Sequence, residues 1–441
     1  MSEPAGTSAS TPSPKAAPSG QTPDPNDLRS RERQEGWAVP LDRVEAFTAG
    51  ALIAVEPDRI EHELMALWQN AAERASESGG RLAVARACLW NFIVHSDGEQ
   101  EYRRTKRAID EVSETVPARI LALHETLDES QSAVVGNDGA PLRAYVEANY
   151  RKVSGGRREM VAEEITLEAT RLQSQRLPGL CRSLLLADVP TALFVRNPAG
   201  DYKWLPPLAR DADRLIFDSG TVDGMHGLLQ VDAALQRLLP TGKPAGTPLP
   251  IDLADLGWLR LWPWRILVAS MFDEPQATAA LPQLDEVHIE YAPDAEPAAL
   301  LLAGWLMGRL HLELGGPAAS PAADASHLDF SLRTGSSGRP VALRLIRGTT
   351  ELAPVGIHRV TLRAGDKSFT ANGTCTGGTP CIELRSPLAP PRVQPVQGRR
   401  DSELLVAAMG IGGRDPLMYE ALRLGTRLAR GSAGRHRQPT G

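Results

Sequence analysis

Apolar and polar positions in the first half of the chain follow two periods that together predict an α/β domain. Continuous runs of Val, Leu, Ile and Phe are typical of strands buried on both faces, whereas apolar residues three and four apart are typical of amphipathic helices. We expect strands at residues 81–95, 119–124, 143–152, 163–167, 189–195 and 213–217. We expect helices at residues 57–75, 97–116, 170–186, 204–211 and 222–239. This alternation predicts right-handed parallel crossovers and a mostly parallel sheet covered by helices.

Prolines and short polar residues mark several ends of these elements. Pro57 suits the first turn of its helix, and Asp97 is placed to cap the next helix, which Pro117 ends. Pro178 falls inside the helix expected at 170–186, where we expect it to kink or split that helix.

The pattern changes at about Ser326, where short strands follow one another with Gly, Asp and Asn turns between them. These strands are expected at residues 328–332, 341–346, 356–363, 367–374 and 381–384. Two helices close the chain: Asp401 is expected to cap the first and Gly410 to end it, and Asp415 followed by Pro416 to start the second. The second half is therefore predicted to be a smaller antiparallel β region with C-terminal helices, of the α+β type.

We expect four regions along the chain. They are a disordered Pro/Ser/Ala-rich tail at 1–40, an N-terminal α/β domain at 41–250, a C-terminal α+β domain at 251–430 and a basic flexible tail at 431–441.

Composition narrows the class of protein. A formal net charge of -6 argues against a nucleic-acid-binding surface. The longest strongly apolar run, 297–308, is shorter than the roughly 20 residues that cross a bilayer, so we expect a buried helix and no membrane span. The start of the chain lacks a secretory signal, and the four cysteines form no CxxC pair, so a reducing cytoplasm is expected.

Motifs for common chemistry are absent from the sequence. Neither GxxxxGK[ST] nor GxGxxG following a strand occurs, so we expect no nucleotide cofactor of the common types. There is no GxSxG motif for a nucleophile, and the nine histidines form no metal-ligand pattern with carboxylates, so no catalytic residue and no metal site is predicted. This absence favours a binding or regulatory role.

Two weaker candidate sites remain. Asp218 and Ser219 follow the expected strand 213–217, where open parallel sheets place a ligand crevice, although both residue types also cap helices. Cys375 and Cys381 flank an expected hairpin turn and form a possible redox pair, with two reduced thiols as the alternative.

The densest chemical signal is the stretch from Trp258 to Arg265, which holds three of the eight tryptophans and two arginines. Trp and Arg are enriched at binding hot spots, and they also stack on each other inside folds. The stretch is therefore compatible with two interpretations, a buried corner of the fold and an exposed recognition surface. Pro263 suits the first turn of a helix that continues beyond Arg265.

Several segments together resemble one known family. They are RACLWNFIVH at 86–95, PARILALH at 117–124, EEITLEA at 163–169, LLLADVPTALFVR at 184–196, DADRLIFDSG at 211–220, LGWLRLWPWRILVASMFD at 256–273 and SELLVAAMGIGGRDPLMYEAL at 402–422. In this order they resemble the glucose-6-phosphate dehydrogenase assembly protein family, OpcA.

The resemblance implies a non-catalytic assembly factor or allosteric activator that binds glucose-6-phosphate dehydrogenase and supports the oxidative pentose phosphate pathway. In some photosynthetic members this control looks linked to thioredoxin. The residues expected to contact the partner are Trp258, Arg260, Trp264 and Arg265. Two rival hypotheses are a sugar-phosphate-binding enzyme that uses the crevice near Asp218 and Ser219, and a scaffold that only stabilises a partner oligomer.

Overall fold

A computed structural model describes most of the chain, and the described residues belong to one compact unit, Glu45–Gly441. They are residues 47–48, 53–55, 59–77, 88–126, 143–153, 157–171, 173–238, 249–315, 326–349 and 356–433. The two predicted tails lie outside these residues, except for the end of the last helix.

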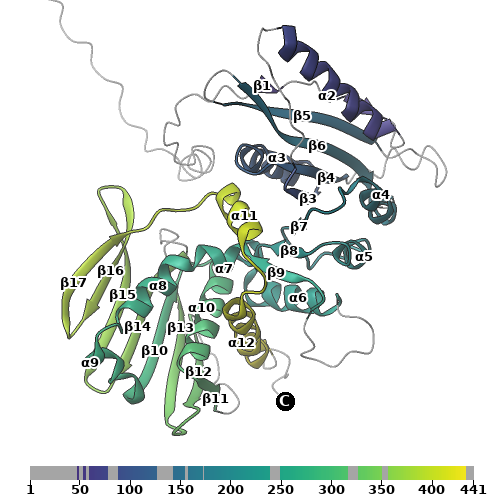
Figure 1. The fold of residues 1–441 in the computed structure, drawn as a ribbon. Coiled ribbons are helices and arrows are strands. Elements are labelled where there is room, and N and C mark those ends of the chain that lie inside the picture. Colours follow the sequence, from purple (N-terminus) through teal and green to yellow (C-terminus); the bar gives the residue numbers. More distant parts are fainter. Residues whose placement is uncertain are drawn as a thin grey trace, which may run out of the picture. The chain divides into compact units, whose positions relative to one another are not determined.

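The first sheet has the strand order of a doubly wound α/β fold (Figure 1). Its strands are β1 (Phe47–Thr48), β2 (Ile53–Val55), β3 (Trp90–Asp97), β4 (Ala118–Thr126), β5 (Arg143–Val153), β6 (Arg157–Thr170), β7 (Thr191–Val195), β8 (Arg214–Phe217) and β9 (Asp252–Asp255). The order β6-β4-β3-β7-β8-β9 is parallel throughout, and β5 adds to β6 antiparallel. The chain moves outward from β3 in one direction and then, from β7, in the other, so the topological switch point lies between β3 and β7.

Helices bury both faces of this sheet, which explains its continuously apolar strands. The helices of the first part are α2 (Ile60–Glu77), α3 (Glu99–Ser113), α4 (Leu177–Leu184), α5 (Leu205–Ala209) and α6 (Gly224–Gln236). Along β3, Phe92 and Val94 pack into the core that α3 shares with the later helix α11 (Asp401–Gly410). Ile93, between them, points into the larger core on the other face, together with apolar residues of α2, α4, α5 and α6.

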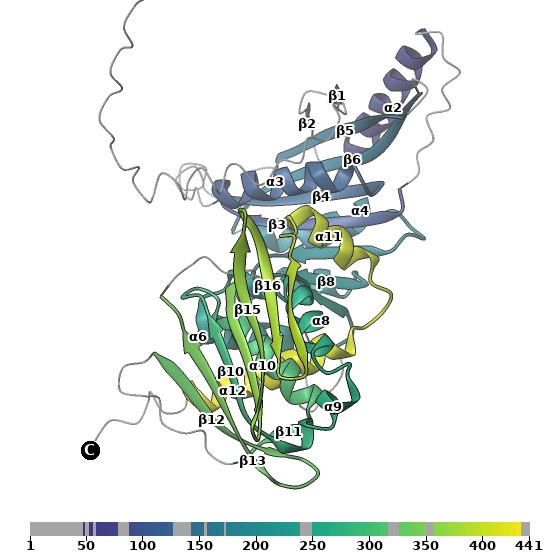
Figure 2. The same ribbon diagram turned by 90° about the vertical axis from the view of Figure 1, so that its left-hand side faces the viewer.

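The second sheet has eight strands, which lie side by side in Figure 2. They are β10 (Leu284–Tyr291), β11 (Leu312–Leu314), β12 (His327–Thr334), β13 (Pro340–Arg347), β14 (Ile357–Ala364), β15 (Lys367–Thr376), β16 (Thr379–Ser386) and β17 (Ala389–Pro395). All neighbours are antiparallel except β10 and β13, which are parallel. Buried and exposed residues alternate along β13, so one face is covered and the other faces solvent.

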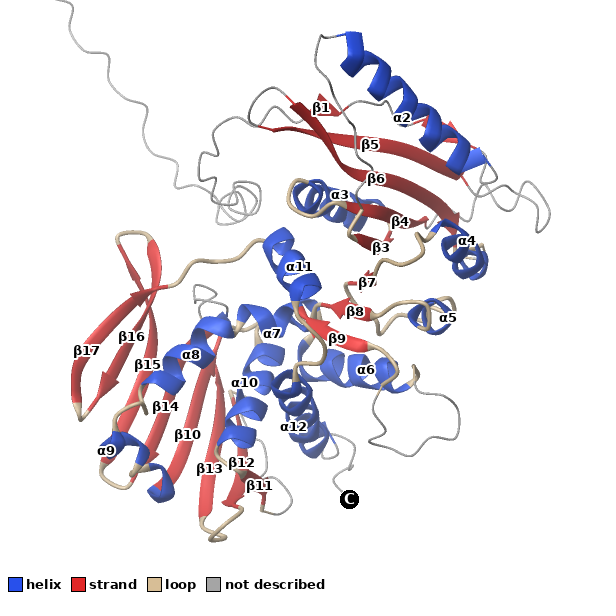
Figure 3. Cartoon of the chain, viewed as in Figure 1, coloured by secondary structure: helices blue, strands red, loops and turns tan. Residues whose placement is uncertain are grey.

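The second half also contains the helices α7 (Leu256–Arg260), α8 (Trp262–Ser270), α9 (Pro275–Thr278), α10 (Glu296–Arg309) and α12 (Pro416–Ala433). Helices α8 and α10 cover the buried face of this sheet, and α12 packs against α10 (Figure 3). Helix α10 is buried from Ala299 to Gly308, which confirms that the apolar run 297–308 is a buried helix.

The predicted fold class is confirmed: a mostly parallel, helix-covered sheet is followed by a mostly antiparallel sheet and C-terminal helices. Six of the described strands were not predicted, namely β1, β2, β9, β10, β11 and β17. The division into domains at residue 250 stays a prediction.

Three predictions about individual helix residues are wrong for local reasons. Strand β3 continues through Asp97, and Gly98, whose φ of 83° suits glycine, is the residue that precedes α3. Pro178 does not kink a helix, because α4 begins at Leu177 and the proline occupies its first turn. Asp401 does not cap α11, because it is already the first helical residue and its carboxylate binds arginines.

The packing of α10 against α12 depends on two glycines. A Cβ atom on Gly304 would lie 2.3 Å from the carbonyl oxygen of Ala421, and one on Gly425 would lie 2.8 Å from that of Leu300. Both contacts are with backbone, which cannot move away as a flexible side chain can. The two helices therefore approach as closely as they do only because neither position carries a side chain.

We expect Gly304→Ala to lower the free energy of unfolding by about 1–3 kcal/mol, because the added methyl group forces α10 and α12 apart. Gly179→Ala in α4 is the matched control, since no atom lies within 4 Å of the added Cβ, and it should stabilise by up to about 1 kcal/mol through helix propensity. Urea unfolding of both variants measures the difference, and equal stabilities would contradict this account of the helix crossing.

Candidate functional site

The carboxyl ends of β8 and β9 carry three buried polar residues. Asp218 and Ser219 follow β8 and are both 0% exposed, and Asp255, the last residue of β9, is 1% exposed. Open parallel sheets bind ligands at this edge. In this chain the edge is filled by contacts among the protein's own side chains.

Ser219 and Asp255 form a closed pair. The Ser219 hydroxyl donates to Asp255 Oδ2 at 2.6 Å, and the backbone N–H groups of Ser219 and Gly257 donate to Asp255 Oδ1, each at 2.9 Å. Burial raises the pKa of Asp255 to about 6, although the hydrogen bonds from Ser219 act against the rise. Because both residues are buried, no substrate reaches the hydroxyl, and the pair holds the end of β8 to the start of α7.

Asp218 is the centre of an ion-pair cluster. Arg260 binds it in bidentate fashion, with distances of 2.5 Å from Nη1 to Oδ1 and 2.9 Å from Nη2 to Oδ2. Arg196, which follows β7, reaches Asp218 Oδ2 at 3.3 Å. The side chain of Asp218 also accepts from the backbone N–H of Gly220 at 3.1 Å, so it caps the short 3-10 helix Ser219–Thr221, whereas Asp223 precedes α6, the helix that Asp218 was expected to cap.

The same arginines bind a carboxylate from the far end of the chain. Asp401 accepts from Arg260 Nη2 at 2.8 Å, from Arg196 Nη1 at 3.1 Å and from Arg104 Nη2 at 3.2 Å. Burial would raise the pKa of Asp401, but the three arginine charges outweigh burial and hold the pKa below its usual value. Helix α11 is thereby fixed to the sheet by its first residue, Asp401.

This cluster contains residues from two sites that were predicted from the sequence as separate. Arg260 belongs to the predicted partner-binding set and Asp218 to the predicted ligand crevice, yet they form one bidentate pair. Arg196 and Asp401 were not predicted as site residues. Arg196 directly follows an apolar strand, as Asp218 does. Its position after that strand could have identified Arg196 as a candidate site residue.

A second polar cluster lies nearer the switch point, at the ends of β3 and β4. His95 Nε2 lies 3.1 Å from Glu125 Oε2, and both side chains are 2% exposed. The His95 ring packs against the rings of Tyr202 and Trp204, with centroids 4.7 and 4.6 Å away. Burial would raise the pKa of Glu125, but the hydrogen bond and charge of His95 lower it below its usual value.

Acidic side chains surround the first turn of α3, which is where a dinucleotide fold binds pyrophosphate. Asp97, Glu99 and Glu101 lie there, and Glu101 Oε2 accepts from the backbone N–H of Asp97 at 3.3 Å. Carboxylates at this point repel a phosphate group. The structure thus agrees with the absence of a phosphate-binding motif in the sequence.

The Trp258–Arg265 stretch has a buried side and an exposed side. Trp258 is 1% exposed and Trp264 is 0% exposed, whereas Trp262 is 48% exposed. Trp258 Nε1 donates to Asp415 Oδ2 at 2.8 Å, and the Arg265 guanidinium lies 3.6 Å from the centre of the Trp258 ring. Burial lowers the pKa of Arg265 to about 10.

Two of the predicted partner-binding rings are therefore in the core. Asp415 also accepts from the N–H groups of Leu417 and Met418, so Trp258 connects α7 to the capped start of α12. The partner-binding role of Trp258, Arg260, Trp264 and Arg265 stays a prediction. Because Trp258 and Trp264 are buried in this structure, neither ring is exposed for direct contact with another protein.

The predicted cysteine pair is not brought together. Cys375 lies opposite Pro380 in the β15–β16 ladder, and Cys381 lies opposite Thr374. Adjacent ladder positions point to opposite faces of a sheet, so the two side chains diverge: Cys375 is exposed and Cys381 is buried, and both are free thiols. A disulfide would require the hairpin to change register by one residue.

Within the described ranges, no group of three or more His, Cys, Asp or Glu side chains could hold a metal ion. No helix of that part of the chain is long and apolar enough to cross a membrane.

The fold and this site define a doubly wound α/β protein with an added antiparallel sheet and a carboxyl edge closed by its own ion pairs. Two family models match the chain, the N-terminal domain of the glucose-6-phosphate dehydrogenase subunit over residues 109–233 and its C-terminal domain over residues 251–422. The chain belongs to the glucose-6-phosphate dehydrogenase assembly protein family, OpcA.

Relatives named OpcA, an OxPP cycle protein, occur in cyanobacteria. The protein of Synechocystis sp. is 26% identical over 246 residues, which are 55% of this chain and 46% of the relative. That of Nostoc punctiforme is 30% identical over 205 residues, 46% of this chain and 40% of the relative. The matched part of the chain thus spans less than half the length of these relatives.

Solved structures resemble the chain only distantly. Aldose-aldose oxidoreductase from Caulobacter crescentus has a TM-score of 0.39 at 12% identity, covering 79% of this chain and 98% of that protein. A mutant of Gal80p from Saccharomyces cerevisiae has a TM-score of 0.43 at 9% identity, covering 79% and 96%. Similarity of this degree carries no argument about function.

We expect Asp218→Asn to lower the free energy of unfolding by up to about 3–5 kcal/mol, because it removes the buried carboxylate between Arg196 and Arg260 and leaves Asp401 as the carboxylate that both arginines share. Asp329→Asn is the matched control: its pair with Arg344 at 2.7 Å lies at the surface, where an ion pair is worth about 1 kcal/mol or less. Thermal and urea unfolding of both variants give the comparison. Equal losses would show that Asp218 is not a central contact.

Asp255 should make stability depend on pH. Its folded-state pKa of about 6 exceeds the value of about 4 in an unfolded chain. The folded state therefore keeps a proton that the unfolded state loses, and this contribution to stability falls as the pH rises from 4 to 6. Asp255→Asn removes the effect, so the stability of the variant relative to wild type should rise by up to about 3 kcal/mol between pH 4 and 7.5.

Urea unfolding at a series of pH values tests this expectation, with Asp329→Asn measured alongside as a control for acid effects elsewhere. A difference between Asp255→Asn and wild type that does not change with pH would contradict the raised pKa.

Proposed function

We propose that this chain is a non-catalytic assembly factor and allosteric activator of glucose-6-phosphate dehydrogenase, acting in the oxidative pentose phosphate pathway. The observation that carries the proposal is the closed carboxyl edge of the parallel sheet. Asp218, Ser219 and Asp255 are buried and bonded to neighbouring groups, so the edge at which such folds perform chemistry is used for internal contacts.

Membership of the family supports the choice of partner, since its two domain models carry the name of a glucose-6-phosphate dehydrogenase subunit. The cyanobacterial relatives are named as OxPP cycle proteins, which supports the choice of pathway. A cytoplasmic location and a link to thioredoxin stay predictions. The separation of Cys375 from Cys381 removes the one dithiol that the sequence suggested.

An activator of this kind acts by binding one state of the enzyme more tightly than another. A preference of about 1.4 kcal/mol for the active state shifts the equilibrium tenfold. This mechanism requires a contact surface and no reacting group on the activator. The rival enzyme hypothesis requires instead that the ion pairs around Asp218 open to admit a sugar phosphate.

The test is a titration of the purified full-length chain into purified glucose-6-phosphate dehydrogenase from the same organism. We expect a saturable rise in turnover at substrate concentrations below KM, together with co-elution of the two proteins. The dehydrogenase with added serum albumin controls for nonspecific protein effects.

The other outcomes are distinct. Turnover of a sugar phosphate by this chain alone would support the enzyme hypothesis. A changed oligomer size of the dehydrogenase with unchanged kinetics would support the scaffold. Neither binding nor activation at micromolar concentrations would refute the proposal.

A further inference from the structure

Helix α8 presents an apolar strip to solvent. Trp262 is 48% exposed and Ile266 is 49% exposed, and a spacing of four residues places both on the same side of the helix. Ala269, three residues after Ile266 along the same helix, is also exposed. Single exposed apolar residues are ordinary, whereas a continuous apolar strip marks an interaction site.

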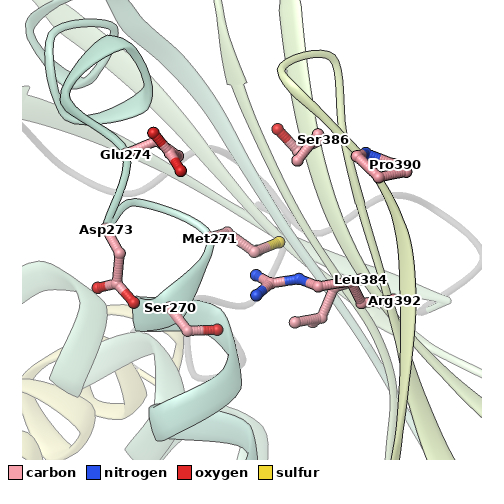
Figure 4. Close-up of a pocket in the computed structure, with 9 residues that line it drawn as sticks. Ser270, Met271, Asp273, Glu274, Leu384, Ser386, Pro390 and Arg392 are labelled. Carbon is pink, nitrogen blue, oxygen red and sulfur yellow. The ribbon is translucent and has the colours of Figure 1, made fainter.

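The strip leads into a pocket. Ser270, four residues beyond Ile266, lines a cavity of about 140 Å³ between the end of α8 and the β16–β17 hairpin. In Figure 4 the guanidinium of Arg392 extends from β17 toward Met271 and Ser270. The apolar strip and this pocket together form the surface that we name the α8 face, defined by Trp262, Ile266, Ser270, Met271 and Arg392.

Two arginines at this surface have no carboxylate partner. The guanidinium carbon of Arg399 lies 5.6 Å from the centre of the Trp262 ring. Among the residues that the structure describes, neither Arg399 nor Arg392 takes part in an ion pair; the neighbouring Arg400, in contrast, is paired with Glu111 and Glu403.

The solvent-exposed face of the second sheet is different. Four of its arginines are paired with carboxylates, in Arg344–Asp329, Arg359–Glu290, Arg363–Glu286 and Arg385–Glu383 at 2.7–3.0 Å. Most of the positive charge on that face is therefore compensated by neighbouring side chains. The pocket end of the α8 face is lined by Asp273 and Glu274 together with Arg392. At the Trp262 end, Arg399 keeps positive charge beside apolar surface, which is the pattern of a contact site for an apolar and acidic segment.

We propose that the α8 face is the surface that binds glucose-6-phosphate dehydrogenase, through a segment that places an apolar side chain on Trp262 and Ile266 and a carboxylate against Arg399. The inference rests on the proposed function, which supplies the partner. A second copy of this chain fits less well. In a two-fold interface the same patch meets itself, and the strip formed by Trp262, Ile266 and Arg399 contains no carboxylate to receive Arg399 of the other copy.

The buried part of the stretch has a supporting role in this arrangement. Trp258 and Trp264 fix α7 and α8 to the core, and the turn between Trp258 and Trp264 directs Trp262 outward. Partner contact is thereby assigned to Trp262 and Ile266, and not to the two buried rings.

The experiment compares matched surface variants of the full-length chain. Ile266→Asp and Trp262→Ala should each weaken the Kd for the dehydrogenase at least tenfold, measured by biolayer interferometry, with the same loss in the activation titration. Met65→Asp on α2 is the control, because Met65 is 55% exposed and lies elsewhere, and it should bind as wild type. Melting temperatures of all variants should match wild type, since the changed residues are at the surface.

A charge test is independent of the apolar one. Arg399→Ala should weaken binding several-fold and reduce its dependence on salt, whereas Arg344→Ala, on the solvent face of the second sheet, should change neither. Wild-type binding by Ile266→Asp, Trp262→Ala and Arg399→Ala would overturn the α8 face while leaving the proposed function in place. No binding by the wild-type chain would overturn both, and loss of self-association in Ile266→Asp would identify a second copy as the occupant instead.

Discussion

The buried carboxylate of Asp218 is the constraint on which the junction of β8, α7 and α11 depends. A fully buried charge is costly unless opposite charge and hydrogen bonds compensate it. Arg260 and Arg196 provide that compensation, and both arginines also bind Asp401, the first residue of α11. One buried charge thus determines where a helix from the end of the chain meets the parallel sheet.

This arrangement explains why the polar residues at the carboxyl ends of β8 and β9 are buried and bonded to one another. The edge positions are taken by Asp218, Ser219 and Asp255, whose hydrogen-bonding atoms are directed at one another and at neighbouring backbone. Stabilising contacts occupy the position that ligand contacts have in enzymes of this topology. What remains available to a partner is the surface of the second half, where α8 carries its exposed apolar strip.

Much of the fold could be predicted from the sequence, because strands such as Thr191–Val195 and helices such as Glu296–Arg309 have periodicities set by local geometry. Strand β10 was not predicted although Leu284, Val287, Ile289 and Tyr291 are its buried residues, because an irregularity between Leu284 and Glu286 breaks the alternation at its start. The candidate site was predicted only in parts. Asp218 and Arg260 were both identified, but their pairing was not, because they are 42 residues apart.

The sequence by itself determined the fold class, the order and type of most elements, the family and the absence of common catalytic motifs, since each of these is encoded in neighbouring residues or in ordered segments. The tertiary structure alone decided which side of the Trp258–Arg265 stretch is buried and which arginine meets which carboxylate. The physical reason is distance along the chain. Arg196 and Asp401 are separated by 205 residues, and only the tertiary fold brings residues so far apart in the sequence into contact.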